Sequence, residues 1–283
     1  MNLTMTKAEI FVPDGVEVKE ALNRTTHLAI SAHQDDIEIM AYDGIIKCFG
    51  KQDNWFTGVV VTNGSGSPRS GLYENYSDEE MMEIRKAEQK KAAYIGEYST
   101  QLLLDYPSSA VKSHSNTDVK EEIKKIITLS KPKVIYTHNL ADKHDTHVAV
   151  AARVIEALRE LPKDMLPEKV YGCEVWRGLD WMNDEDKLKF DVAGHPNLES
   201  ALLEVFDSQI CGGKRYDLAT VGRRLANATY AESHGTDDTN SLTYAMDLTP
   251  LINDVSMDVN DYVQQYIKNF SNDVERKIKN LFS

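Results

Sequence analysis

Ser31-Ala32-His33-Gln34-Asp35-Asp36-Ile37-Glu38 is the stretch of sequence from which we predict the fold. The apolar run before it is typical of a buried strand, and residues 37–49 are apolar at helical spacing without proline. Asp35 or Asp36 could cap that helix, but one cap accounts for only one acidic residue. Ligands and metals bind at the carboxyl ends of strands in an open α/β sheet. We therefore interpret His33 and Asp36 as two metal ligands and Asp35 as a base.

Strand-like apolar runs alternate with helical patterns along the first part of the chain. The expected strands are 27–32, 54–62, 101–104, 133–137 and 171–175, and the expected helices are 37–49, 77–95, 119–129 and 147–161. Ser77 and Glu80 at the start of one helix have the spacing of a capping box. This alternation predicts an α/β fold, a Rossmann-like, mostly parallel sheet with helices on both faces.

After residue 175 the pattern is looser. Helices are expected over 197–207 and 217–233, and residues 251–282 are expected to form a long amphipathic terminal helix. We expect residues 1–175 to form a Rossmann-like metal-binding portion. Residues 176–283 would form a smaller α+β portion that completes the pocket within one continuous domain. The terminal apolar stripe could pack on its own domain or on another subunit, so a monomer and a homo-oligomer both remain open.

The composition limits the classes of molecule that we expect the protein to bind. The chain of 283 residues has 45 acidic and 32 basic residues, a formal net charge of -13, which argues against nucleic acid or an anionic membrane surface as the main partner. No run resembles a signal peptide or a membrane span, so we expect a cytoplasmic protein. Cys48, Cys173 and Cys211 are far apart and lack a Cys-x-x-Cys pairing, so neither disulfides nor a structural zinc site is expected.

A second cluster of polar residues occupies positions 138–147. His144 and His147 are three residues apart at a helix start, so both can face the same way. His147 shares its face with apolar residues, which by itself favours a histidine packed in the core. Because it follows a strand of the same predicted sheet, however, it could approach His33 and Asp36. Two histidines and one carboxylate with an open position are typical of catalytic zinc sites.

A glycine- and serine-rich loop, residues 63–71, follows the second predicted strand and would overhang the same edge of the sheet as His33. It is not a phosphate-binding loop, because no Gly-Lys-Ser/Thr follows it. We interpret it as a mobile flap near the site, with an ordinary surface loop as the alternative.

These motifs resemble those of the PIG-L / LmbE-like zinc N-deacetylases. Residues 32–38, Ala-His-Gln-Asp-Asp-Ile-Glu, resemble the family's Ala-His-x-Asp-Asp-x-Glu motif. Residues 144–147, His-Asp-Thr-His, are similar to its His-x-Asp-His motif. The similarity extends to residues 61–64, 84–96 and 207–209. It covers about the first 160 residues in order and spacing and the rest only loosely.

The resemblance implies a role for each matching residue. His33, Asp36 and His147 would bind one zinc ion per chain, Asp35 would be the general base, and His144 would be the protonated partner of the substrate carbonyl. Zinc lowers the pKa of a bound water from about 15.7 to about 7. Asp35 could then take the proton of that water and return it to the leaving amine. Zinc and His144 would share the negative charge that develops on the amide oxygen.

The sequence departs from the family pattern at two positions. Thr146 stands where the family usually has an aspartate that orients and charges the neighbouring histidine, and Asp145 or Asp142 could take that role. Gln34 stands where proline or alanine is common, and we expect little effect. Thr146 therefore bears on the strength of His144 as an acid and not on metal binding.

The other candidate residues would contact substrate. The resemblance implies that Arg85 contacts a substrate hydroxyl, with an ordinary surface arginine as the alternative. Asp105 follows a predicted strand and could bind sugar hydroxyls, and Asn63 and Arg69 of the 63–71 loop are further candidates. Trp176 could stack on a sugar ring or pack in the core.

The function that the resemblance implies is zinc-dependent removal of an acetyl group from an N-acetylated amino sugar or its conjugate. An N-acetylglucosaminyl compound is the implied substrate class, and neither a nucleic acid nor a membrane is an expected partner. Two alternatives remain open. One is a catalytically weak, metal-retaining sugar-binding protein, motivated by Thr146, and the other is an amidase that acts on a different conjugate.

Overall fold

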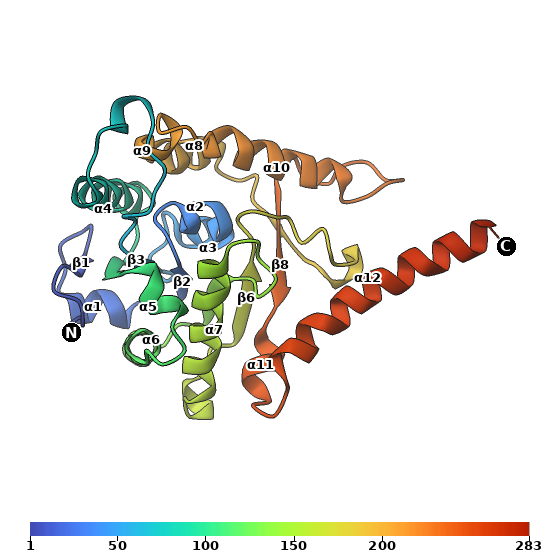
Figure 1. Ribbon diagram of the computed structural model, residues 1–283, viewed down its shortest axis with the longest axis horizontal. Helices are drawn as coiled ribbons and strands as arrows, with labels where there is room; N and C mark the ends of the chain where they lie inside the picture. Colours follow the sequence, from blue (N-terminus) through green and yellow to red (C-terminus); the bar gives the residue numbers. More distant parts are fainter. Residues whose placement is uncertain (283) are drawn as a thin grey trace.

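An eight-stranded sheet lies at the centre of the computed structural model, which describes residues 1–282 (Figure 1). The strand order is β1-β4-β3-β2-β5-β6-β8-β7. The strands are β1 (Glu9–Phe11), β2 (His27–Ser31), β3 (Phe56–Thr62), β4 (Thr100–Tyr106), β5 (Val134–His138), β6 (Lys169–Cys173), β7 (Leu188–Asp191) and β8 (Leu242–Asp247). The five strands from β4 to β6 pair in parallel, and β1, β7 and β8 are antiparallel to their neighbours. The predicted α/β fold with a mostly parallel sheet is confirmed.

Helices cover both faces of the sheet (Figure 1). They are α1 (Val18–Asn23), α2 (Asp36–Met40), α3 (Tyr42–Cys48), α4 (Asp78–Ile95), α5 (Ser108–Lys112), α6 (Asp118–Ser130), α7 (Asp145–Arg159), α8 (Pro196–Glu204), α9 (Asp207–Ile210), α10 (Tyr216–Tyr230), α11 (Thr249–Asn253) and α12 (Val259–Phe282). Successive strand residues point to opposite faces. In β2, Leu28 and Ile30 therefore pack in the core beneath α6 and α7, whereas Ala29 packs beneath α2, α3 and α8.

The expected helix over 37–49 is divided into α2 and α3. The break lies at Ala41, whose φ of -114° and ψ of 22° are not helical. Arg224 of α10 explains it, because its guanidinium donates hydrogen bonds to the carbonyl oxygens of Glu38 and Ile39, both at 2.9 Å. In a continuous helix those carbonyls would accept from the residues four positions later.

The expected terminal helix over 251–282 is also divided, into α11 and α12. Arg159 of α7 donates to the carbonyl oxygens of Leu251 and Met257, both at 2.7 Å, and Asp254 accepts from the backbone N–H of Ser256. These contacts hold the intervening turn.

The strands β7 and β8, which follow residue 175, belong to the same sheet as the earlier strands.

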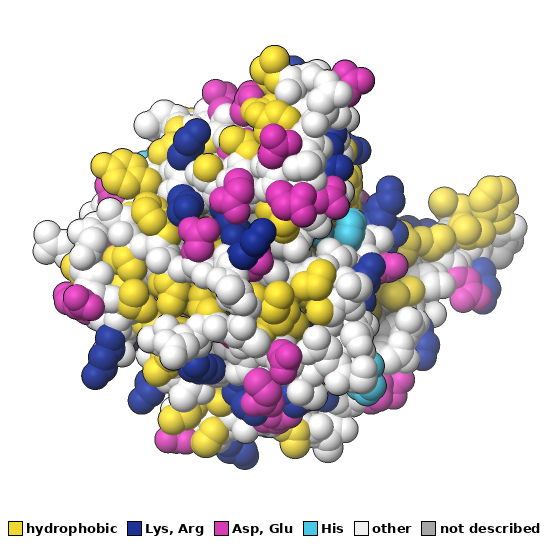
Figure 2. Space-filling model, turned by 60° about the vertical axis from the view of Figure 1, so that its left-hand side comes forward, with side chains coloured by type: hydrophobic (Ala, Val, Ile, Leu, Met, Phe, Trp, Pro, Cys, Tyr) yellow, Lys and Arg dark blue, Asp and Glu magenta, His cyan; other side chains and the backbone are white. Residues whose placement is uncertain are grey.

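Helix α12 extends away from the rest of the molecule (Figures 1 and 2). Tyr262 and Val263 near its start are buried, whereas Phe270, Val274 and Ile278 on its outer part are exposed. Figure 2 shows apolar side chains gathered toward the end of this projection. In the described part of the chain, no helix has the length and hydropathy needed to cross a membrane.

The register of the central strands sets the position of the site. β2 and β5 are parallel neighbours, with Ile30 opposite Thr137, and β3 lies on the other side of β2. The loops that follow these strands therefore begin side by side at one edge of the sheet. The capping box predicted for Ser77 and Glu80 is present and starts α4, which packs against β4, α8 and α9.

Candidate metal centre and active site

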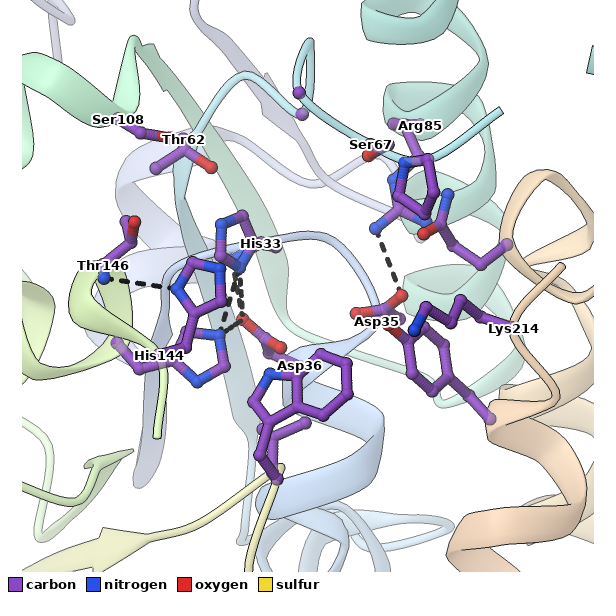
Figure 3. Close-up of a pocket in the computed structure, with 18 of the residues that line it drawn as sticks. His33, Asp35, Asp36, Thr62, Ser67, Arg85, Ser108, His144, Thr146 and Lys214 are labelled. Carbon is purple, nitrogen blue, oxygen red and sulfur yellow. Dashed lines mark hydrogen bonds and ion pairs between the residues drawn. The ribbon is translucent and has the colours of Figure 1, made fainter. Parts of the chain in front are cut away.

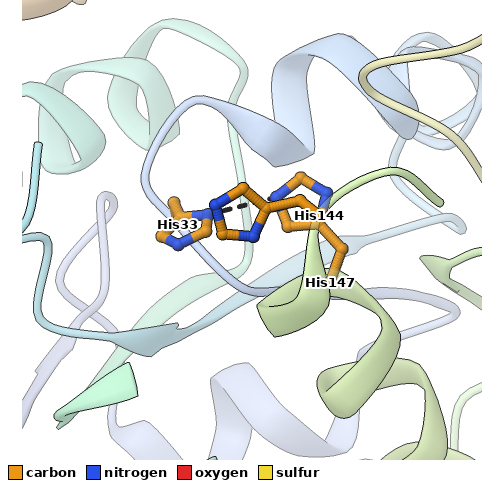
Figure 4. A group of neighbouring side chains, drawn as sticks. All are labelled: His33, His144 and His147. Atoms are coloured by element: carbon orange, nitrogen blue, oxygen red, sulfur yellow. Dashed lines mark hydrogen bonds between the residues drawn. The ribbon is translucent and has the colours of Figure 1, made fainter. Parts of the chain in front are cut away.

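Three ligand atoms converge at this edge. His33 lies in the loop after β2, Asp36 begins α2, and His147 lies in the first turn of α7. The Nδ1 atom of His33 is 3.2 Å from Nε2 of His147, and Oδ2 of Asp36 is 3.3 Å from the first nitrogen and 3.4 Å from the second. Figure 4 shows the rings of His33 and His147 facing one another. A tetrahedral zinc ion with bonds of about 2.0–2.1 Å places its ligand atoms roughly 3.3 Å apart, so the donor set and its spacing fit zinc.

The backbone separates the two neighbouring aspartates. Asp35 has φ +84°, in the left-handed region that a non-glycine residue adopts only when its surroundings hold it there. Asp36 consequently faces the histidines, and its Oδ2 also accepts a 2.7 Å hydrogen bond from the backbone N–H of His33. Asp35 instead lies on the side of Arg85 (Figure 3). The two neighbouring aspartates therefore face different partners, Asp36 the histidines and Asp35 the guanidinium of Arg85.

Asp36 is anionic in this setting. Burial opposes its ionisation, but His147, together with His138 and His33, holds the pKa of Asp36 well below its usual range. For His147 burial lowers the pKa, but Asp36 and Asp142 outweigh it and raise the pKa. The attraction between Asp36 and His147 thus preassembles the ligand pair.

His138 belongs to this cluster although the sequence motifs predict no role for it. It is the last residue of β5, is fully buried, and stacks on His147 with 3.9 Å between ring centroids. Its Nε2 accepts from the backbone N–H of Ala32 at 2.8 Å and lies 3.3 Å from Oδ2 of Asp36. Burial and the neighbouring His147 lower the pKa of His138 to about 4, so it is neutral at pH 7. The sequence feature that could have indicated this role is its position at the end of a strand, just before the segment that carries His144 and His147.

Two histidine-containing groups are close enough to hold a metal ion. One consists of His33, His144 and His147, and the other of Asp36, His138 and His147. His147 belongs to both and is therefore the centre of the cluster. The backbone N–H of Ala32 already occupies Nε2 of His138, whereas Nδ1 of His33 and Oδ2 of Asp36 both lie close to Nε2 of His147.

Asp142 lies behind His147. Its Oδ2 is 3.3 Å from Nδ1 of that ring, and its carboxylate accepts from the backbone N–H groups of His144 and Val175. The sequence offers Asp142 and Asp145 as residues that could orient the His144 ring. Asp142 contacts the ring of His147 and only the backbone of His144. A carboxylate behind a ligating histidine fixes its tautomer and orientation.

His144 has a different partner. Its Nδ1 accepts from the backbone N–H of Thr146 at 3.2 Å, so a neutral His144 carries its proton on Nε2. Burial, with the nearby His147 and His33, lowers the pKa of His144. We therefore expect a neutral imidazole with an Nε2–H donor at neutral pH, in place of the protonated form that the family resemblance implies.

Asp35 forms a buried ion pair with Arg85. Nη2 of Arg85 is 3.1 Å from Oδ2 of Asp35, and the same guanidinium donates to the carbonyl oxygen of Gln34. Burial raises the pKa of Asp35 to about 6, against the lowering effect of Arg85, and Asp36 raises it further. A carboxyl with a pKa near neutrality can both accept and return a proton. Arg85 lines the pocket but is engaged with this aspartate.

A second layer of side chains holds Asp35 from below. The backbone N–H of Asp35 donates to Oε1 of Gln89 at 3.2 Å, and Nε2 of Gln89 donates to Glu38 at 2.9 Å. Glu38 also accepts from the hydroxyl of Tyr98 at 2.7 Å. Burial raises the pKa of Glu38 to about 8. Gln89 and Tyr98 lie more than 50 positions after Asp35 in the chain. Only the folded structure shows that they support Asp35 and Glu38.

A pocket of about 300 Å³ is lined by His33, Asp35, Asp36, Arg85, His144 and His147. The 63–71 loop contributes part of its wall through Gly64, Gly66, Ser67 and Pro68. Trp176 also lines the pocket, and its ring meets that of Tyr216 edge to face at 5.9 Å. The other residues of the lining are Thr62, Ser108, Lys112, Thr146, Val175, Gln209 and Lys214.

Three predicted substrate contacts lie outside this lining. Asn63 accepts from the backbone N–H of Ser65, and Arg69 donates to the carbonyl oxygen of Ser65 at 3.0 Å, so both serve the loop itself. Asp105 pairs with Lys86 at 3.2 Å. The structure therefore brings Arg85 to the pocket and directs Asn63, Arg69 and Asp105 to other partners.

Residues 28–158 match a family model described as PIG-L: GlcNAc-PI de-N-acetylase. This segment is a PIG-L family domain. It contains His33, Asp36, His138, His144 and His147, together with Asp35, Arg85 and the 63–71 loop. The opposite wall of the pocket, from Val175 to Tyr216, comes from outside the PIG-L domain.

Solved structures share the fold of most of the chain at low identity. An N,N′-diacetylchitobiose deacetylase from Pyrococcus horikoshii is 16% identical with a TM-score of 0.64, covering 82% of this chain and 86% of its own. The conserved protein TT1542 from Thermus thermophilus is 15% identical with a TM-score of 0.59, covering 78% and 94%. GalB, the 4-carboxy-2-hydroxymuconate hydratase from Pseudomonas putida, is 15% identical with a TM-score of 0.58, covering 79% and 95%. Since a deacetylase and a hydratase share this fold, the reaction has to be argued from the site.

Proposed function

We propose that this protein is a zinc-dependent N-deacetylase that hydrolyses the acetamide of an N-acetylated amino sugar or its conjugate. The observation that carries the proposal is the convergence of His33 Nδ1, Asp36 Oδ2 and His147 Nε2 beside a second, unligated carboxylate. The PIG-L family domain supports the substrate class, an N-acetylglucosaminyl compound.

His33, Asp36 and His147 would hold one zinc ion. When bound, zinc supplies a water acidified to a pKa of about 7 and polarises the acetamide carbonyl. Asp142 keeps Nε2 of His147 directed at the site by occupying the other ring nitrogen. Asp36 supplies the negative charge that offsets the cation.

Asp35 is the proposed general base. It accepts a proton from the attacking water and returns it to the amine as the C–N bond breaks, so that acetate and the free amino sugar leave. Arg85 holds its carboxylate toward the pocket, and Gln89 holds its backbone. With a pKa of about 6, Asp35 is still mostly ionised at pH 7. Because that pKa is higher than the ordinary value of an aspartate, the carboxylate is also a stronger base.

His144 is the proposed donor to the amide oxygen. The backbone N–H of Thr146 occupies Nδ1, which leaves an Nε2–H group as the donor. A neutral donor placed where charge develops still stabilises the transition state, and loss of such a donor typically lowers the rate by roughly 10²–10³. The replacement of the family's aspartate by Thr146 is thereby compatible with catalysis.

The test is metal analysis combined with acetate release from a panel of N-acetylglucosamine derivatives. We expect one zinc per chain and acetate release that is abolished by Asp35→Asn with zinc retained. Asp53→Asn, at an exposed position away from the pocket, is the matched control and should leave the rate unchanged. Zinc binding without turnover of any compound would instead favour the metal-retaining sugar-binding protein. Turnover confined to bulkier acyl groups would favour an amidase acting on another conjugate.

A further inference from the structure

Helix α12 extends beyond the body of the molecule, and its described residues take no part in the lining of the pocket (Figure 1). Near its start, Tyr262 and Val263 are buried and Ile267 packs against the core. The outer part of the helix, residues 268–282, instead carries its apolar side chains on the surface, and Leu281 is 82% exposed. The body of the protein therefore covers the first part of this helix and leaves the outer part uncovered.

The exposed apolar side chains of the outer part form one stripe. Their positions repeat every three or four residues, the spacing that places side chains on one face of a helix. The stripe continues the face that packs on the core through Val263 and Ile267. Apolar residues at this spacing are typical of the seam between two packed helices. The stripe consists of Phe270, Val274, Ile278 and Leu281.

The outer part is a weak helix on its own. Isolated helices shorter than roughly 12–15 residues are marginal in water, and most of the stability of a helix in a protein comes from the packing of its apolar face. The outer part is close to this length and includes three asparagines, which are poor helix formers. Ion pairs of Asp273 with Lys277 and of Glu275 with Lys279 support it only slightly, because exposed pairs contribute little. Burial of the stripe is therefore the interaction that would stabilise this helix.

Charge is distributed unevenly along this end of the chain. Residues 254–261 at the base of α12 include three aspartates and no lysine or arginine, whereas the outer part has four basic and two acidic residues. When two copies of α12 pack antiparallel, the basic end of each helix approaches the acidic base of the other, and the helix dipoles are oppositely directed. A parallel pair would bring like charges together. The charges thus favour an antiparallel partner of the same sequence.

The residues beside the stripe argue against a membrane surface. Asp273 precedes Val274 and Glu275 follows it, so an acidic side chain lies on each side of the stripe. A helix that lies on an anionic membrane carries lysine and arginine beside its apolar face. Charges of both signs beside an apolar seam are instead typical of paired helices, in which they set the partner and its orientation.

We infer that the stripe binds the stripe of a second copy of this chain, so that two α12 helices pack antiparallel about a two-fold axis. The same surface serves both copies, and closure by the axis leaves no unpaired surface for a further copy. The inference does not depend on the proposed function, because the described residues of α12 lie outside the pocket.

Sedimentation equilibrium of the full-length protein over a range of concentrations tests the inference. We expect a monomer–dimer equilibrium, and a dissociation constant at least about 100-fold higher for Val274→Lys/Ile278→Lys, which places like charges against one another in the interface. Asn269→Lys/Asn272→Lys adds the same charge to the opposite, exposed face of the helix and is the matched control, whose dimer should persist. A monomer at every concentration, or a dimer that survives Val274→Lys/Ile278→Lys, would overturn the inference.

Distances between spin labels test the orientation of the two helices. Labels are attached at Asn272→Cys or at Asn280→Cys, each combined with Cys211→Ser to remove the exposed native thiol, and measured by double electron–electron resonance. An antiparallel pair places the labels at 272 closer together than those at 280, because the two helix ends point in opposite directions. Similar distances at both positions would indicate a parallel pair and overturn the inference. Binding of a monomeric chain to phosphatidylserine vesicles through α12 would also overturn it, and would assign the stripe to a membrane.

Discussion

Asp142 stands directly behind His147, with its Oδ2 atom 3.3 Å from Nδ1 of the ring, and so determines which ring nitrogen faces Asp36. The same carboxylate accepts from the backbone N–H of His144. One side chain therefore ties the start of α7 to the orientation of a metal ligand. It does this from outside the set of atoms that would touch the metal.

Removal of this carboxylate's charge should weaken metal binding. For Asp142→Asn we expect zinc affinity to fall roughly 10- to 100-fold, as is typical when the partner of a ligating histidine is lost. Competition with a chromophoric chelator measures the affinity directly. Asp145→Asn changes an exposed aspartate in the same segment and should leave the affinity unchanged. An equal loss in both variants would mean that Asp142 acts through the general charge of the segment.

The pairing of Arg85 with Asp35 predicts a shift in the pH dependence of the reaction. Arg85 lowers the pKa of Asp35, so Arg85→Gln should raise that pKa above about 6. The base is active when ionised, and the acidic limb of the kcat/KM profile should therefore move to higher pH. Zinc content should be retained, because Arg85 does not face the metal ligands.

Arg85→Lys serves as the matched variant for that experiment, because it keeps the charge without the guanidinium geometry. We expect its acidic limb to lie between those of the original protein and Arg85→Gln. An acidic limb that stays in place in Arg85→Gln would contradict the assignment of Asp35 as the titrating base. Far-ultraviolet circular dichroism of each variant establishes that the fold is kept.

The position of Thr146 predicts how the titration of His144 responds to a nearby charge. Thr146→Asp should place a carboxylate near His144 and raise the pKa of that histidine, which burial now lowers. An NMR titration of the His144 ring should then show a higher pKa than in the original protein. Thr146→Asn has the same shape without the charge and should not move it. Equal pKa values for the two variants would show that position 146 does not control the protonation of His144.

Local sequence patterns are sufficient to predict the sheet and the convergence of His33, Asp36 and His147 at its edge. Parallel strands place their carboxyl ends at one edge, so His33 after β2 and His147 after β5 could be brought together from strand order alone. The distances between their ring nitrogens and Asp36 accord with that expectation.

Contacts between distant segments account for what the sequence does not predict. The division of residues 37–49 into α2 and α3 depends on Arg224, which is more than 180 positions away in the chain. Gln89 and Tyr98 beneath Asp35 belong to other elements, and no spacing connects them to it. The contacts of His138 are likewise not predictable from residue spacing, because a single histidine at the end of a strand belongs to no periodic pattern.

The buried Glu38 predicts a dependence of stability on pH. Burial raises its pKa in the folded protein to about 8, well above the ordinary value of 4.5, so the folded state binds the proton more tightly than the unfolded state. Glu38 therefore makes the free energy of unfolding fall as pH rises from about 4.5 to about 8, by up to roughly 1.4 kcal/mol per pH unit. Glu38→Gln cannot ionise and should lose this contribution.

Urea unfolding of Glu38→Gln and the original protein, both without metal, at a series of pH values from 5 to 9 isolates the carboxyl, because their difference cancels other titrating groups. The amide can still accept from Gln89 and Tyr98, so we expect similar stability near pH 5 and a growing advantage for the variant toward pH 8. Glu79→Gln, at an exposed position on α4, should show no such trend. A constant difference across the range would mean that Glu38 is already ionised in the folded protein, and that a cation or water not accounted for by Gln89 and Tyr98 stabilises its charge.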